Sequence, residues 1–272
     1  MNKKMGQPER DELHFLGTAG ARFVMITQFR ASAGTVLSLK DTRVLIDPGP
    51  GTLVKFTASK PRLNPAKLDA ILLTHKHLDH SNDVNVMIEA MTEGGFKRRG
   101  VLLCPRDALT NEGDAVVLNY YRALVDRIEV FREGGSYPVG NLLIETPKRH
   151  MHGTVETYGL NVKVRGDQGE RTVVSFVADT LYFEELERYY DGKVLVLNVA
   201  MYKRREGVDH LTVNDARTII EANRPRVTIL THFGMTMLRN KPWEIAKQLS
   251  METGVEVIAA RDGMRFDLSP FI

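Results

Sequence analysis

Cysteine is almost absent from this sequence, and long apolar runs are missing altogether. Cys104 is the single cysteine among 272 residues, which excludes an internal disulfide and fits a reducing compartment. Because it lies in the apolar stretch 101–105, we interpret it as a buried bystander. No run approaches the ~18 apolar residues of a membrane span, and the polar start is not a secretory signal. We therefore expect a cytoplasmic protein without membrane contact, with residues 1–11 as a flexible tail.

A strong excess of one charge is also missing. The chain has 37 basic and 34 acidic residues, a net charge of +3. That balance is too mild to predict nucleic-acid binding by itself, although it does not oppose a phosphate-bearing substrate. We find no DNA-binding motif. Two basic triplets, at 97–99 and 203–205, either steer phosphates or form solvated faces.

The chain is long enough for one large α/β domain or two small ones. We find no internal repeat, low-complexity tract or linker, so we predict one domain over residues 1–272. Apolar runs predict strands first and then alternating strands and helices, a pattern that suits two packed sheets with helices outside. The strands are predicted at 13–16, 35–39, 44–46, 70–73, 101–103, 128–131, 142–145, 158–164, 172–178, 193–199, 227–230, 255–258 and 264–266, with a hairpin turn at Asp41-Thr42 and helices after Asp83, Thr212 and Lys241.

The densest group of potential metal ligands follows the predicted strand 70–73. It reads His75-Lys76-His77-Leu78-Asp79-His80. Alternation along an extended chain points His75 and His77 the same way, while Asp79 and His80 follow where the chain turns. One histidine in a loop would favour a polar helix cap. Three histidines and an aspartate favour a site for a divalent ion such as zinc, manganese or iron.

Further acids and histidines follow other predicted strands. Asp47, Asp179 and His232 each end one, and strand ends are where open α/β architectures place their sites. Ligand histidines usually donate their far ring N–H to a carboxylate, so we interpret Asp47 as a supporting carboxylate beside the metal ligands. His150 and His152, in a separate loop, are both candidates for a ligand.

The order Asp, His-x-His-x-Asp-His, His, Asp, His resembles the metallo-β-lactamase superfamily of hydrolases, over nearly the whole chain. The resemblance implies a four-layer αββα sandwich with two mixed β-sheets and helices outside. It also implies two divalent metal ions, with zinc as the preferred metal and manganese or iron as alternatives. A hydroxide shared by the two ions would be the nucleophile, oriented by Asp79. His75, His77 and His152 would hold the first metal, Asp79, His80 and His232 the second, and Asp179 would bridge them. His152 is preferred to His150 because it stands closer to Tyr158-Gly159.

His210 indicates a particular branch of this hydrolase superfamily. The blocks 209–216 and 230–233 resemble the corresponding segments of tRNase Z and related cyclic phosphodiesterases, as do 17–20 and 47–52. In that branch the extra histidine serves as acid towards the leaving oxygen, a role that a near-neutral pKa suits. Ser81-Asn82-Asp83 replaces the glycine that often follows the central motif. Only 26 residues separate His152 from Asp179, which leaves no room for a long tRNA-gripping arm.

We therefore predict a dinuclear metal-dependent phosphodiesterase, with Asp79 and His210 as catalytic residues. Its substrate would be RNA or a small molecule such as a cyclic phosphate. Two alternatives stay open. A hydrolase of thioesters, lactams or esters would keep the metals and have no use for His210. A non-catalytic metal- or ligand-binding protein would be expected to have lost ligands. The sequence leaves a homodimer open.

Overall fold

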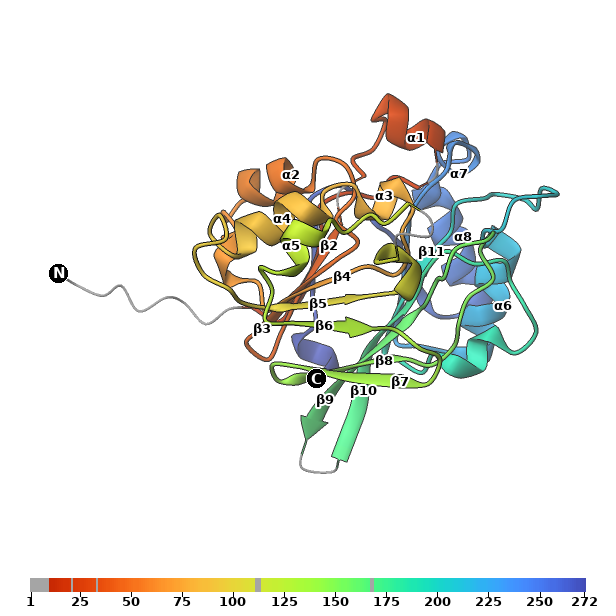
Figure 1. Ribbon diagram of the computed structural model, residues 1–272. Coiled ribbons are helices and arrows are strands. Elements are labelled where there is room, and N and C mark those ends of the chain that lie inside the picture. The colour runs from red at the N-terminus through yellow and green to blue at the C-terminus, as the bar shows by residue number, and fades with distance from the viewer. Residues whose placement is uncertain (1–9, 21, 33, 111–113, 167–168) are drawn as a thin grey trace.

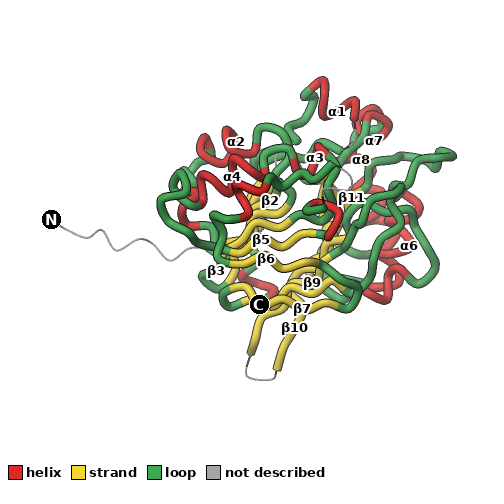
Figure 2. The backbone as a smooth tube through the Cα atoms, viewed as in Figure 1, coloured by secondary structure: helices red, strands yellow, loops and turns green. Residues whose placement is uncertain are grey.

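Two β-sheets pack face to face, with helices on both outer faces (Figure 1). The computed structural model describes residues 10–20, 22–32, 34–110, 114–166 and 169–272. Each sheet has seven strands within these residues, and the tube in Figure 2 shows the strands gathered in the middle of the molecule. The four-layer αββα sandwich with two mixed sheets, predicted from the sequence, is confirmed.

The first sheet has the order β14-β1-β2-β3-β4-β5-β6. Its pairs are antiparallel from β14 to β3 and parallel from β3 to β6. The β2–β3 turn consists of Lys40 and Asp41, both left-handed, one residue earlier than predicted, because Thr42 already pairs with Leu39. The strands are β1 Glu12–Phe15, β2 Thr35–Leu39, β3 Thr42–Ile46, β4 Ala70–Leu72, β5 Val101–Cys104, β6 Arg127–Val130 and β14 Met264–Asp267.

The second sheet has the order β13-β12-β11-β10-β9-β8-β7. It is antiparallel from β7 to β10 and parallel from β10 to β13. We did not predict β7, whose Pro138 argues against a central strand; it lies at the sheet edge, where proline is tolerated. The strands are β7 Gly135–Val139, β8 Leu142–Thr146, β9 Leu160–Gly166, β10 Gly169–Val177, β11 Val194–Asn198, β12 Val227–Thr231 and β13 Glu256–Ala259.

The helices follow the apolar faces of the sheets. The predicted stripe of α4, Val84–Met91, is fully buried against the first sheet, and the predicted capping box of Thr212 and Asp215 opens α6, Val213–Asn223, on the second. The remaining α-helices are α1 Arg22–Thr27, α2 Thr52–Ala58, α3 Leu78–Ser81, α5 Asn119–Arg122, α7 Met235–Arg239 and α8 Pro242–Thr253, with 3-10 turns at Pro65–Lys67, Arg106–Ala108, Leu186–Tyr189 and Ser269–Phe271.

The first strand lies next to the edge of the first sheet, and the single cysteine lies in the core. Cys104 is fully buried, as expected. Most of the predicted tail, residues 1–9, lies outside the described residues. Asp11 is already tied down, because its carboxylate accepts a hydrogen bond from Lys40 N (2.6 Å) and its carbonyl accepts one from Leu268 N (2.8 Å). Among the described residues, no helix is long and apolar enough to cross a membrane.

The topology brings one end of both sheets together. β3 and β4 run parallel in the first sheet, and β8, β10 and β12 share one direction in the second. The loops that follow these five strands therefore gather at one edge of the sandwich, and they carry the acids and histidines that the sequence singled out.

Candidate metal centre

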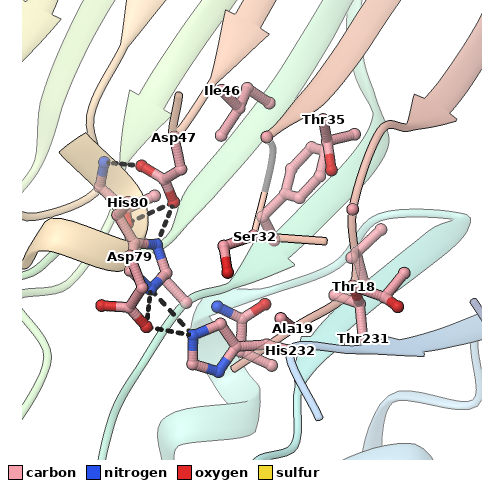
Figure 3. Close-up of a pocket in the computed structure, with 17 residues that line it drawn as sticks. Thr18, Ala19, Ser32, Thr35, Ile46, Asp47, Asp79, His80, Thr231 and His232 are labelled. Carbon is pink, nitrogen blue, oxygen red and sulfur yellow. Dashed lines mark hydrogen bonds and ion pairs between the residues drawn. The ribbon is translucent and has the colours of Figure 1, made fainter. Parts of the chain in front are cut away.

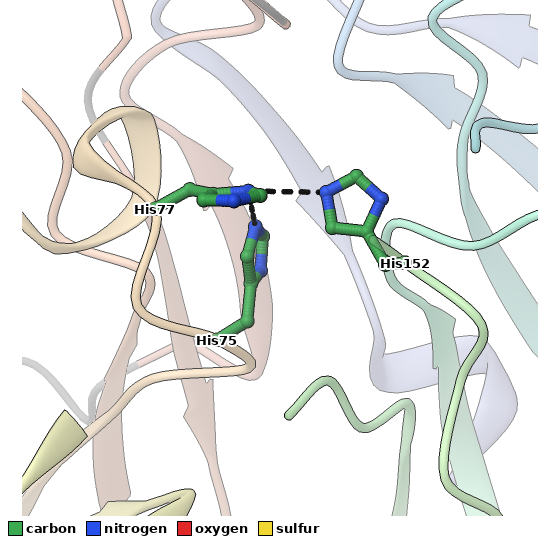
Figure 4. A group of neighbouring side chains, drawn as sticks. All are labelled: His75, His77 and His152. Atoms are coloured by element: carbon green, nitrogen blue, oxygen red, sulfur yellow. Dashed lines mark hydrogen bonds between the residues drawn. The ribbon is translucent and has the colours of Figure 1, made fainter. Parts of the chain in front are cut away.

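Three imidazoles from two loops point at one another (Figure 4). His75 and His77 follow the buried strand β4, and His152 comes from the loop after β8. His77 Nδ1 lies 3.1 Å from His75 Nε2 and 3.1 Å from His152 Nε2. These three nitrogens form the first group of donors.

A second group of donors lies around His80, where Figure 3 shows Asp79 and His232 beside its ring. His80 Nε2 lies 2.9 Å from His232 Nε2, and Asp79 Oδ2 lies 3.3 Å from the same His232 nitrogen. Asp79 and His80 belong to α3, whereas His232 follows β12 with a left-handed backbone, φ 59°. Non-glycine residues in that conformation cluster at functional sites.

Asp179 lies between the two groups. It follows β10 and is 1% exposed. Its Oδ2 lies 4.0 Å from His75 Nε2 and 3.7 Å from His152 Nε2 on one side, and 3.5 Å from His80 Nε2 on the other. A carboxylate in this place can reach an ion in either group.

The donor set fits divalent metal ions. Within each of the two groups, one nitrogen or oxygen per residue lies within 4.8 Å of the others. Imidazole nitrogens face one another across 2.9–3.1 Å, and two lone pairs this close repel each other unless a proton or a cation lies between them. Neutral imidazole and carboxylate are ligands that zinc, manganese and iron accept.

The carboxylate of Asp47 supports His80 from behind. It accepts hydrogen bonds from Thr74 N at 2.6 Å, Thr74 Oγ1 at 2.7 Å and His80 Nδ1 at 2.9 Å. Because the carboxylate is an acceptor, the His80 proton lies on Nδ1, and Nε2 keeps its lone pair for an ion. This is the arrangement that the supporting role predicted for Asp47 requires.

Two residues that hold the carboxylates of the centre were not predicted from the sequence. Thr74 binds both oxygens of Asp47, and Asn198 Nδ2 donates to Asp179 Oδ1 at 2.8 Å. Asn198 is the last residue of β11. The rule that picked Asp179, a polar residue at the end of an apolar strand, would also have picked Asn198.

The choice between His150 and His152 is visible in the packing. His150 turns away from the centre, with its Nε2 2.6 Å from Tyr190 Oη and its Nδ1 3.3 Å from the Asp179 carbonyl. His152 aims Nε2 at His77 and Asp179. The structure therefore places His152, and not His150, among the possible ligands.

His210 lies at the rim of the same cluster. Its Nδ1 is 3.5 Å from Asp179 Oδ2, and its ring centroid is 4.9 Å from that of His152. This nitrogen is buried, and it has no hydrogen-bond partner among the described residues. Burial lowers the pKa of His210 to about 4, against the pull of the Asp179 carboxylate. The near-neutral pKa assumed from the sequence is therefore not that of the free chain.

The charges of the centre offset one another. Burial opposes ionisation of Asp179, yet His232, His210 and His80 hold the pKa of this carboxyl well below its usual range. Burial likewise opposes protonation of His80, but the carboxylates of Asp79, Asp47 and Asp179 raise its pKa. Since a metal ligand must be deprotonated, ions and protons compete for these groups.

Close backbone packing shapes the centre at Gly49. A Cβ at this position would overlap the carbonyl oxygens of Asp79 and Ser32. We expect Gly49→Ala to push α3 away and to destabilise the fold by about 1–3 kcal/mol, the usual cost of overpacking. Metal affinity should fall with it. Denaturant unfolding and metal titration measure both effects, with Pro50→Ala as the neighbouring control; unchanged stability and affinity in Gly49→Ala would contradict this prediction.

The two basic triplets have different surroundings. In the first, Lys97 pairs with Glu93, while Arg98 and Arg99 donate to backbone carbonyls. It precedes β5 and so lies at the opposite end of the sheet from the centre. In the second, Arg204 donates to the His210 carbonyl and to Asp215. Only the second triplet lies next to the candidate site.

The fold and this donor set together define the metallo-β-lactamase type of hydrolase. The chain belongs to the beta-lactamase superfamily, whose domain matches residues 42–233. Within it, the relatives of the chain place it in the tRNase Z-like branch.

Three of these relatives and structures show the range of similarity. An uncharacterized protein of Methanocaldococcus jannaschii is 30% identical over 264 residues, covering 95% of this chain and 96% of that protein. A ribonuclease Z of Clostridium tetani is 24% identical, covering 82% and 88%. The crystal structure of the metallo-beta-lactamase fold protein YhfI from Bacillus subtilis superposes with a TM-score of 0.75 at 19% identity, covering 95% of this chain and all of that one.

Proposed function

We propose that this protein is a phosphodiesterase that acts on RNA or a cyclic phosphate. It would work with two divalent metal ions, for which zinc is our preferred assignment. His75, His77 and His152 would hold one ion, and Asp79, His80 and His232 the other, with Asp179 between them. When bound, such ions act as Lewis acids and lower the pKa of coordinated water towards ~7. Since both sheets supply ligands, we also propose that the chain works as one domain.

Asp79 has a second task in this proposal. Its Oδ2 lies 3.3 Å from His232 Nε2 and 3.6 Å from His80 Nε2. The His80 and His232 imidazoles hold the pKa of its carboxyl low although burial opposes ionisation. An ionised carboxylate here accepts a hydrogen bond from the attacking water and fixes its orientation.

The observation that carries the phosphodiester assignment is the place of His210. It lies 3.5 Å from Asp179 and outside the two groups assigned to the ions, although with His152 and Asp179 it forms a further group that could hold an ion. An alkoxide leaving group needs a proton, and imidazole can supply one. Because the pKa of His210 is about 4 in the free chain, the ring must gain that proton with the substrate, whose anionic phosphate favours the charged form. The ribonuclease Z relative supports the same substrate class.

A substrate panel tests the proposal. We expect the zinc- or manganese-reconstituted protein to hydrolyse a bis-aryl phosphodiester, and then 2′,3′-cyclic phosphates or short RNA, much faster than a thioester or a lactam. Hydrolysis of the thioester or lactam alone, with two metals bound per chain, would contradict it and favour the alternative that leaves His210 without a role.

A further inference from the structure

The loop between β11 and α6, residues 199–212, carries His210 and is exposed in its middle part. The two ends of the loop are joined by a backbone hydrogen bond, which Met201 N donates to the Leu211 carbonyl at 3.2 Å. Residues 203–207 are exposed, so the core does not fix this part of the loop, whereas Leu211, on the other side of His210, is fully buried in the core. On the exposed side of His210, specific contacts must therefore hold the loop at the centre.

Asp209 supplies two such contacts, both to the loop that carries His152. Its backbone carbonyl lies 2.8 Å from His152 Nδ1, and its carboxylate Oδ2 accepts a hydrogen bond from Gly153 N at 2.9 Å. These contacts join segments more than fifty residues apart in the chain. Arg204 holds the other side of the same turn through the His210 carbonyl at 3.1 Å and Asp215 at 2.7 Å.

The first contact decides the protonation of His152. A carbonyl oxygen can only accept, so Nδ1 of His152 carries the proton and Nε2 keeps its lone pair. That Nε2 is the atom 3.1 Å from His77 Nδ1 and 3.7 Å from Asp179 Oδ2. The carbonyl is in reach only while the loop stays docked, and the carboxylate bond to Gly153 is the side-chain contact that ties it to the His152 loop.

We propose that Asp209 is a positioning residue that clamps the His210 loop onto the His152 loop and so sets the first metal site and the proton donor together. This inference rests on the proposed function, because it takes His152 as a metal ligand. It goes further in naming one residue, outside both donor groups, on which one metal site depends and the other does not. The second group, Asp79, His80 and His232, is supported by Asp47 instead.

Two substitutions at this position separate its roles. Asp209→Ala deletes the acceptor for Gly153 N–H, whereas Asp209→Asn keeps an acceptor oxygen and removes only the charge. Loss of a residue that supports a metal ligand typically costs about 10–100-fold in metal affinity. Glu206→Ala, in the exposed part of the same loop, is the matched control.

The experiment is zinc titration against a chromogenic chelator, resolved into two stepwise affinities for the full chain. We expect Asp209→Ala to weaken one zinc site by about 10–100-fold and to leave the other unchanged, with Asp209→Asn and Glu206→Ala close to the wild type. Unchanged affinities in Asp209→Ala, equal loss at both sites, or an Asn variant as weak as the Ala variant would each overturn the proposal.

The failure of the proposed function gives a different result. In that case the wild-type protein holds two zinc ions and hydrolyses no phosphodiester, while the zinc affinities of the Asp209 variants still report on the clamp. Circular dichroism and thermal unfolding of each variant verify that it is folded before titration.

Discussion

His80→Ala should lose bound metal and turnover together. His80 is 3% exposed, and its ring joins the second donor group, through His232 and Asp79, to the supporting carboxylate of Asp47. Without the ring, one donor is missing and Asp47 and Asp179 face each other with less positive charge between them. We expect at most one metal ion per chain and a fall in kcat of about a thousandfold, or about 4 kcal/mol in activation free energy.

Metal analysis by mass spectrometry and phosphodiester kinetics measure the two effects on the same samples. His75→Ala, on the other side of Asp179, should behave in the same way. His14→Gln is the matched control, because it removes a buried imidazole from β1, away from the centre. Two ions retained per chain in His80→Ala, or wild-type turnover with one ion, would show that His80 is not a ligand of a catalytic metal.

His210→Ala should separate metal binding from chemistry. His210 lies outside the two donor groups, although it forms a further possible group with His152 and Asp179, and in our proposal both ions stay when its ring is removed. A general acid contributes about 10²–10⁴-fold, so kcat for a substrate with an alkyl leaving group should fall by about that factor. A nitrophenolate leaving group needs no proton, and its kcat should change little.

The comparison of the two leaving groups is what identifies the acid. An equal loss on alkyl and aryl substrates would indicate that His210 orients the substrate and does not donate the proton. An unchanged kcat on the alkyl substrate would remove its role altogether. Zinc content, measured on the same preparations, excludes loss of metal as the cause of either result.

The sequence was most informative where residue type and strand position agreed. The motif at 75–80 follows an apolar strand, and Asp47, Asp179 and His232 each follow another, so the rule that sites lie at strand ends was enough to group them. The structure brings them together, although the assignment of each as a ligand stays a prediction. The buried stripe of α4 and the capping box of α6 were equally readable, because both are local patterns.

What the sequence could not provide depends on contacts between distant segments. His150 and His152 are two residues apart, so alternation alone aims both the same way. In the structure His150 contacts Tyr190, whereas His152 contacts His77. The short helices α1, α5 and α7 span six residues or fewer, too few to show a helical period. The low pKa of His210 follows from burial, which no local pattern reports.

The most direct test of a two-metal phosphodiesterase is to titrate the metal-free protein with zinc, following bound zinc and bis-aryl phosphodiester hydrolysis at each addition. Two donor groups joined by Asp179 predict that turnover rises with occupancy and levels off at two ions per chain, and that a chelator abolishes it. Two zinc ions bound per chain without phosphodiester turnover would contradict the account.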